Sequence, residues 1–190
     1  MIVLDIETTG MEPKRNSLLS MGAVEFEKPS NTFYGECRID EGAAVNPTAL
    51  KINGFTLKQI TDRSKPASEE LIKKFLAWAA KIKDKTLAGD NIWFDIRFMT
   101  VYLERMKVKW PFGKRSVELH LLSPLTAALQ WDLDIVLQIV GMPPRKGSHN
   151  ALNDALLEAE TISRLVYGKN MVKKFAKFPL PDYMKNGLRP

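Results

Sequence analysis

The chain has 190 residues, 45% of them hydrophobic and 26% charged, a composition that indicates a folded domain and excludes a disordered or collagen-like polypeptide. The formal net charge is +6, and the single cysteine, Cys37, excludes an internal disulfide and a zinc site built from cysteines alone. No stretch is apolar for long enough to cross a bilayer, and Met1 leads into the first predicted strand without a signal peptide. We therefore expect a cytoplasmic protein, or a nuclear one in a eukaryote, that does not act at a membrane.

The positive charge is concentrated near the C-terminus. Residues 169–190 contain six Lys or Arg residues and one acid, and so carry +5 of the net charge, with Phe175, Phe178 and Tyr183 among them. Such a segment could hold a phosphate backbone and stack a base, or it could be a solvated tail that its aromatic side chains fix to the domain. We divide the chain into a domain of residues 1–168 and this basic C-terminal tail.

The first part of the chain is predicted to form three strands. Residues 3–8, 17–26 and 32–39 have the composition of strands, and short turns separate them. Because the links are short, the strands are expected to form an antiparallel meander, with the first strand in the interior of the sheet.

Helices alternate with short strands in the rest of the chain. Apolar residues at steps of three and four indicate long helices at residues 67–84, from 91 to about 106, and at 150–167. The other predicted elements are helical pieces after Pro47 that break at Asn53-Gly54, strands at 86–88 and 116–119, helical segments at 124–130 and 132–140, and an irregular loop at 141–147. This order predicts an α/β protein with a mixed five-stranded sheet flanked by helices.

Two acids lie close together on the first predicted strand. Asp5 and Glu7 alternate with Leu4 and Ile6, so both carboxylates point to one face of the sheet while the apolar side chains point to the other. Adjacent carboxylates repel each other and favour a bound cation. The alternative is an edge strand with a solvated polar face.

Asp95 is a third acid in an unusual position. It lies three residues after Ile92 and four before Met99, and therefore on the apolar stripe of its helix. A buried carboxylate requires a partner or a metal ion, although Asp95 is also close enough to the helix start to act as a capping acid. Asp90, in the turn before the helix, is the better candidate for the cap, with Asn91 beside it.

The last acid of interest, Asp154, lies at the border of the apolar stripe of the final helix. His149 is five residues earlier, and on a continuous helix it would point away from Asp154, so we place it in the preceding loop. A neutral imidazole in a loop is the usual general base near pH 7, and the alternative is a capping or exposed histidine. His120 has no acid at a useful spacing, and we interpret it as structural.

Asp5, Glu7, Asp95, His149 and Asp154 give the chain a resemblance to the DEDDh, or DnaQ-like, 3′-to-5′ exonucleases, the family of the proofreading epsilon subunit of bacterial DNA polymerase III. The segments DIETTGM, NIWFD and HNALND match the three motifs of that family in order and spacing, and the similarity extends over roughly residues 1–168.

The resemblance implies a ribonuclease H-like fold and metal-dependent hydrolysis that releases nucleoside monophosphates from nucleic-acid 3′ ends. It implies two Mg²⁺ ions, for which Mn²⁺ can substitute, held by four carboxylates. The implied roles are metal binding for Asp5, Glu7, Asp95 and Asp154, proton abstraction for His149, and contact with the terminal nucleotide for Thr8, Gly10, Met11 and Asn91.

The substrate that we expect is a single-stranded or frayed 3′ end of DNA, recognised through its backbone and by stacking. An RNA-trimming or oligoribonuclease-type enzyme would use the same chemistry, and a non-catalytic nucleic-acid-binding or polymerase-associated module is the alternative from another class. A polymerase or another replication or repair protein is a candidate partner. Two departures from the family pattern, Asp90 before the second motif and Glu118 on the fifth strand, bear on the subfamily.

Overall fold

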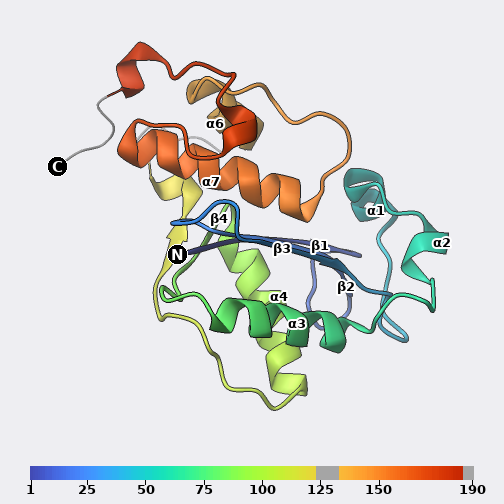
Figure 1. Cartoon of the computed structure of the whole chain (residues 1–190). Helices are drawn as coiled ribbons and strands as arrows, with labels where there is room; N and C mark the ends of the chain where they lie inside the picture. Colours follow the sequence, from blue (N-terminus) through green and yellow to red (C-terminus); the bar gives the residue numbers. More distant parts are fainter. Residues whose placement is uncertain (123–132, 186–190) are drawn as a thin grey trace.

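A mixed five-stranded sheet forms the centre of the computed structural model, which describes residues 1–122 and 133–185 (Figure 1). Its strands are β1 (Ile2–Thr8), β2 (Leu18–Glu25), β3 (Thr32–Glu36), β4 (Leu87–Gly89) and β5 (Ser116–Glu118). They lie in the order β3-β2-β1-β4-β5, with β1 antiparallel to β2 and parallel to β4. The predicted mixed sheet with an interior first strand is therefore confirmed.

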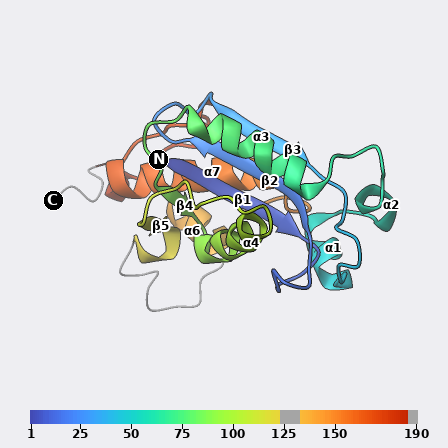
Figure 2. The ribbon, with the colours of Figure 1, turned by 90° about the horizontal axis from the view of Figure 1, so that it is seen from below.

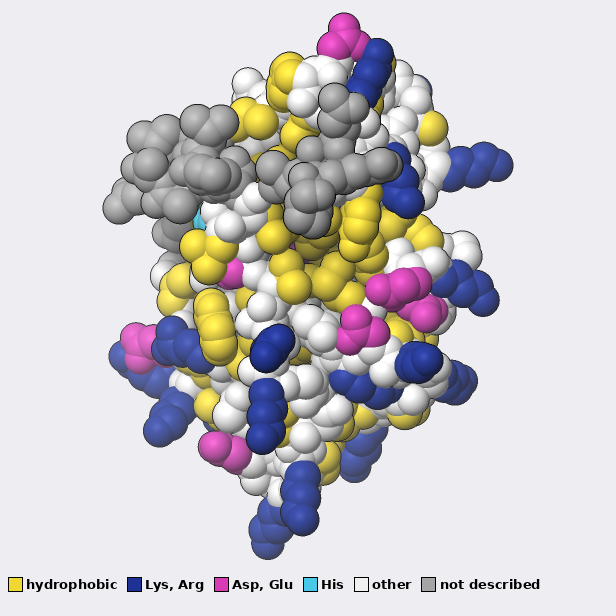
Figure 3. Space-filling view, turned by 90° about the vertical axis from the view of Figure 1, so that its left-hand side faces the viewer, with side chains coloured by type: hydrophobic (Ala, Val, Ile, Leu, Met, Phe, Trp, Pro, Cys, Tyr) yellow, Lys and Arg dark blue, Asp and Glu magenta, His cyan; other side chains and the backbone are white. Residues whose placement is uncertain are grey.

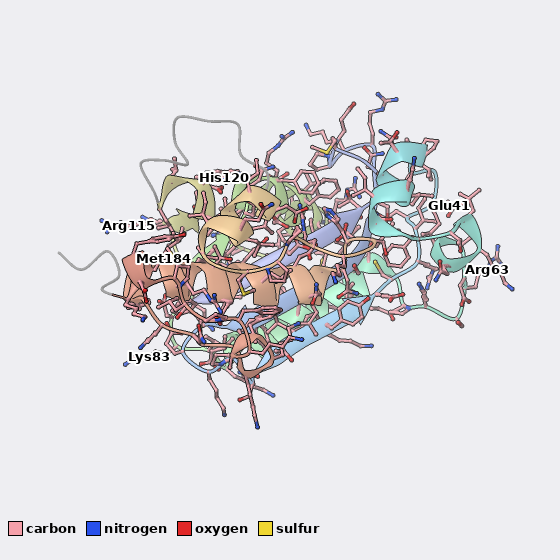
Figure 4. The ribbon with its side chains drawn as sticks, turned by 90° about the horizontal axis from the view of Figure 1, so that it is seen from above. Glu41, Arg63, Lys83, Arg115, His120 and Met184 are labelled. Atoms are coloured by element: carbon pink, nitrogen blue, oxygen red, sulfur yellow. The ribbon has the colours of Figure 1, made fainter. Side chains whose placement is uncertain are left out.

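Helices cover both faces of this sheet (Figures 1 and 2). The helices are α1 (Pro47–Asn53), α2 (Leu57–Ile60), α3 (Ser68–Ala80), α4 (Ile92–Arg105), α6 (Leu133–Ile139) and α7 (Ala151–Tyr167). α3 and α4 lie on one face, and α6 and α7 lie on the other. Viewed from the α7 side, α1 and α2 lie at one end of the molecule with Glu41 and Arg63, whereas Arg115 and Met184 lie at the opposite end (Figure 4).

Side-chain alternation along β1 explains the two layers. Leu4 and Ile6 belong to the apolar core on the α3–α4 face, whereas Val3 belongs to the core on the α7 face. Asp5 and Glu7 have the same parity as Val3, so β1 presents both acids toward α7. β1 therefore contributes apolar side chains to both cores and directs both acids toward α7.

Two predicted elements end earlier than the sequence suggested. β3 ends at Glu36. The Cys37 N–H still donates to Leu19 O of β2, but the chain then leaves the sheet: Arg38 N–H donates to Pro66 O, and Ile39 N–H donates to Ile60 O. α3 ends at Ala80 rather than at residue 84. The helix predicted at residues 124–130 and the first residue of the one predicted at 132–140 lie outside the described residues.

Gly22 on β2 fixes how closely α7 approaches the sheet. A Cβ atom at this position would lie 2.1 Å from the backbone carbon of Ala151 and the backbone nitrogen of Leu152. Backbone atoms cannot move aside as a flexible side chain can, so a glycine is required here. Gly22 is also the register partner of Asp5. The close approach therefore places the first turn of α7 directly beside the acids of β1.

Residues 169–185 pack against α7. Phe175 is buried in the core on the α7 face. The buried Arg164 donates to two backbone carbonyl oxygens of this segment. Glu160, which pairs with Arg164 at 2.8 Å, accepts two backbone N–H groups of the same segment. An aromatic side chain thus fixes this segment to the domain, as the second interpretation of the sequence expected. The boundary between a domain and a tail remains a prediction.

Within residues 1–122 and 133–185, no helix combines the length and the apolar character that a membrane span needs. At the end of the molecule where the N-terminus lies, Lys and Arg side chains are spread over the surface around apolar side chains rather than gathered in one compact patch (Figure 3).

Candidate active site

A pocket of about 280 Å³ collects most of the residues predicted to form the site. Asp5, Glu7, Asp95 and His149 all line it, although they come from β1, α4 and the loop before α7. A larger hollow of about 780 Å³, beside residues 38–43, contains none of the predicted site residues. The chemistry of the side chains, and not the size of the hollow, identifies the functional pocket.

β1 supplies the floor of this pocket. Asp5 and Glu7 pair in register with Gly22 and Ser20 of β2, and the register shifts between Glu7 and Thr8, where the strand ends. Oδ2 of Asp5 is buried and accepts no hydrogen bond from the described residues. A carboxylate oxygen in this state lacks the compensation that buried charges normally have.

Asp95 joins α4 to the same strand. It is buried in the first turn of the helix, and its Oδ1 accepts the backbone N–H of Ile6 at 2.9 Å. This bond crosses from helix to sheet, so Asp95 fixes the backbone of β1 between the two acids. The side chain faces the pocket, as its place on the buried stripe predicted, and does not extend outward as a surface cap.

The loop before α7 brings His149 to Asp154. The His149 N–H donates to the Ile52 carbonyl oxygen at 3.0 Å, which attaches the loop to the end of α1. Nδ1 of His149 lies 3.6 Å from Oδ2 of the buried Asp154. His149 is therefore in the loop, as predicted, and Asp154 is at the start of α7, where Asn150 caps the helix by accepting the Asn153 N–H.

Three of the four residues expected to contact a terminal nucleotide line the pocket. Thr8, Met11 and Asn91 line it, and Met11 has 65% of its surface exposed, as a side chain that stacks on a base would require. The Thr8 hydroxyl donates to the Gly10 carbonyl oxygen at 2.7 Å, so Gly10 shapes the turn and is not among the pocket-lining residues described. Ile52 adds a second exposed apolar side chain.

Burial and mutual repulsion shift the acids strongly toward their neutral forms. Burial raises the pKa of Glu7 from 4.5 to about 8, repulsion by Asp154 adds to this effect, and Arg145 partly offsets it. Burial, and then repulsion by Glu7 and other acids, raises the pKa of Asp5 well above its usual range. Burial also raises the pKa of Asp95 and Asp154. The site contains more negative charge than its cationic side chains neutralise.

These residues fit a divalent cation. One ligand atom each from Glu7, His149 and Asp154 lie within 4.8 Å of one another, and Asp5 adds an uncompensated carboxylate oxygen in the same pocket. Carboxylate oxygens are hard ligands, which favour Mg²⁺ or Mn²⁺ over softer metals. A bound cation would supply the charge compensation that the buried acids otherwise lack.

The predicted cap of α4 is wrong. Asn91 occupies the cap position with a left-handed backbone (φ 54°) but makes no side-chain capping bond within the described residues. The Glu118 carboxylate instead accepts the N–H groups of Asn91 and Ile92, at 2.9 and 3.1 Å. Parallel pairing of Gly89 with Glu118 brings this acid to the helix start.

Sequence spacing offered His120 no acidic partner, but the structure shows one. Its Nε2 lies 3.1 Å from Oδ1 of Asp90, so the acid expected to cap α4 contacts the histidine instead. The two residues are thirty positions apart, and only the pairing of β4 with β5 brings them together.

The sequence analysis missed two charged residues of the pocket, Arg145 and Glu158. Arg145 donates to Asp134 of α6 at 2.9 Å, and its Nη1 lies 3.8 Å from Oδ2 of Asp154 and 3.4 Å from Nδ1 of His149. Glu158, one turn after Asp154 on α7, is buried and also lines the pocket. Its signal was present: a residue four positions after Asp154 shares the same face of the helix.

The chain is similar in sequence to proteins named as polymerases and exonucleases, and similar in fold to a solved nuclease domain. DNA polymerase III PolC-type of Thermotoga maritima is 26% identical over 97% of this chain, and the chain spans only 13% of that relative's length. The 3′-5′ DNA exonuclease Cap18 of Escherichia coli is 28% identical over 84% of this chain and 87% of its own. The nuclease domain of 3′hExo, a DEDDh family member bound to rAMP, has the same fold, with a TM-score of 0.70, 19% identity and 95% coverage of both chains.

A model of one protein family also matches most of the chain. The match covers residues 2–162, which contain every residue assigned to the site above, and the family is described as an exonuclease. The resemblance to DEDDh exonucleases inferred from the sequence and the ribonuclease H-like fold are thereby confirmed. The chain belongs to the RNase_T exonuclease family.

Proposed function

We propose that this protein is a 3′-to-5′ exonuclease that uses two Mg²⁺ ions, replaceable by Mn²⁺, to release nucleoside monophosphates from nucleic-acid 3′ ends. The observation that carries the proposal is the convergence of Asp5, Glu7, Asp95, Asp154 and His149 in one place, with buried carboxylate oxygens that lack hydrogen-bond partners among the described residues. Membership of the RNase_T exonuclease family supports it.

The four acids would hold the metal ions. When bound, the ions neutralise the scissile phosphate and lower the pKa of the attacking water. Asp5 and Glu7 are fixed by the sheet register, Asp95 by its bond to the Ile6 N–H, and Asp154 by the first turn of α7. This support from regular elements holds the carboxylates in a fixed arrangement before substrate arrives, which reduces the reorganisation needed in the transition state.

His149 would take the proton from the attacking water. Its side chain is about one-third exposed at 34%, lies in a loop and faces Asp154, so it can reach both the pocket and solvent. Thr8, Met11 and Asn91 line the same pocket, and we assign to them the contacts with the last nucleotide. Contacts of this kind recognise the end of a strand through its backbone and a stacked base, and impose little sequence preference.

DNA is the substrate that we favour, with RNA as the alternative. The Cap18 relative is named as a DNA exonuclease, whereas the 3′hExo domain was solved with rAMP. The choice depends on contacts with the 2′-hydroxyl. Matched DNA and RNA oligonucleotides, single- and double-stranded and of one sequence, would give the ratio of kcat/KM values that identifies the substrate.

The proposal is tested by the release of mononucleotides from a 3′-labelled oligonucleotide. We expect release with Mg²⁺ or Mn²⁺, none with EDTA, and none from an Asp5→Ala variant that still folds. The rival function, a nucleic-acid-binding module without turnover, predicts binding of the oligonucleotide and no release from the wild-type protein. Full activity of Asp5→Ala would show that the metal ligands are assigned wrongly.

A polymerase is a candidate partner. The chain matches about one-eighth of a PolC-type polymerase, which indicates that this fold operates within replication proteins as well as alone. Co-purification of the full chain with a polymerase subunit would support such an association, and a monodisperse active monomer without affinity for polymerase would argue for a stand-alone enzyme.

A further inference from the structure

Glu158 is a buried acid for which the proposed reaction gives no role. It lies in the middle of α7 with 1% of its surface exposed, and its Oε2 accepts no hydrogen bond from the described residues. A buried carboxylate oxygen without a hydrogen-bond donor lowers the stability of the folded state, because its lost hydration is not replaced. Something outside the described side chains should therefore compensate it.

The surroundings of Glu158 are acidic. Its carboxylate reaches β4, where Oε2 lies 3.4 Å from the position that a Cβ atom on Gly89 would occupy. After burial, the effects that raise its pKa are repulsion by Asp5, Asp90, Asp95 and Asp154, in that order. Glu158 lines the same pocket as Asp5 and Asp95, and its contact with Gly89 shows that it approaches these acids from the side of β4.

A second buried glutamate on the same helix provides the contrast. Glu160 is also buried, but it pairs with Arg164 at 2.8 Å and accepts two backbone N–H groups. The fold therefore compensates Glu160 completely with its own donors. Glu158, two residues earlier, faces the pocket that contains Asp5 and Asp95.

We propose that Glu158 is a fifth carboxylate of the metal centre, which helps to hold the divalent ion bound by Asp5, either as a ligand or through a bound water. This inference rests on the proposed metal-dependent function. It assigns to the chain a metal-binding residue outside the four acids of the motifs. A buried oxygen without a donor, directed into a pocket of carboxylates, is what a cation would complete.

Metal affinity of the full-length protein tests the inference without reference to activity. Mn²⁺ is titrated calorimetrically into EDTA-treated wild type, Glu158→Gln and Glu158→Asp, and Tm is measured with and without the ion. We expect Glu158→Gln to bind Mn²⁺ about 10- to 100-fold more weakly, and its Tm to rise less on addition of metal. Glu158→Asp, whose carboxylate is one methylene shorter, should also bind more weakly than wild type.

Glu160→Gln is the matched control, because it removes a buried charge from the same helix without touching the pocket. It should lower Tm with and without Mn²⁺ and leave the Kd for the ion unchanged. Wild-type affinity in both folded Glu158 variants would overturn the inference and make Glu158 a protonated structural residue. If the wild type itself binds no divalent ion, the proposed function fails as well, so the two failures are distinguishable.

Discussion

Replacing Glu7 with Gln should stabilise the metal-free protein at neutral and alkaline pH. Burial and repulsion by Asp154 raise the Glu7 pKa from 4.5 to about 8, so the ionised side chain opposes folding when no cation is bound. One pKa unit corresponds to ~1.4 kcal/mol, and the difference therefore amounts to about 5 kcal/mol once the group is ionised in both states. For a chain of this length that is roughly 10 to 20 °C in Tm.

The pH dependence follows from the same shift. Below pH 4.5 the carboxyl group is protonated in both the folded and the unfolded state, so wild type and variant should be equally stable. Between pH 4.5 and about 8 the unfolded state loses the proton first, and the stability of the wild type should fall relative to the variant as pH rises. Above about pH 8 the difference should level off.

Urea unfolding in EDTA at a series of pH values measures this difference directly. Glu104→Gln, a substitution of an exposed acid on α4, controls for loss of one negative charge from the molecule. Addition of Mg²⁺ should reverse the order, because the wild type gains a ligand that the variant lacks. A Glu7→Gln protein that is less stable than wild type at every pH would refute the reasoning.

Three further substitutions test separate parts of the structure. His149→Ala should reduce turnover by about 10² or more while Mn²⁺ still raises Tm; near-normal turnover would exclude His149 as the base. Gly22→Ala places a methyl group on the backbone of α7 and should destabilise the fold by about 1 to 3 kcal/mol in urea unfolding, whereas Gly113→Ala, whose Cβ would have no neighbour nearer than 3.5 Å, should have little effect. Glu118→Ala removes the carboxylate that caps α4 and should lower the free energy of unfolding by about 1 to 2 kcal/mol; an unchanged value would show that solvent caps the helix equally well.

The sequence by itself was sufficient for the features that depend on local periodicity. Alternation along β1 predicted that Asp5 and Glu7 share a face. The helical stripe placed Asp95 on the apolar side of its helix, with a capping acid as the alternative, and the structure shows Asp95 buried. On one continuous helix, His149 and Asp154 would point to different sides, which predicted that the histidine lies in the loop before the helix. Backbone geometry determines these relations within a few residues, so no knowledge of the rest of the fold was needed.

Only the tertiary structure decided which residues distant in sequence meet. The cap on α4 comes from Glu118, and Asp90 contacts His120, because parallel pairing brings β5 beside β4. Arg145 reaches Asp154 through a loop whose path no periodicity predicts. Such contacts depend on strand order and on the approach of layers, which are properties of the whole chain.

Glu158 shows where the two kinds of information meet. Its spacing of four from Asp154 was visible in the sequence, but a glutamate at that spacing is equally consistent with a solvated face. The glycine at position 22 allows α7 to approach the sheet closely, and in the packed structure Glu158 is buried and lines the pocket that contains Asp5. Local pattern determined which helix face carries the acid. The packing of α7 on the sheet decided that this acid is buried in the pocket with Asp5 and Asp95, because burial is set by packing and not by the sequence of one element.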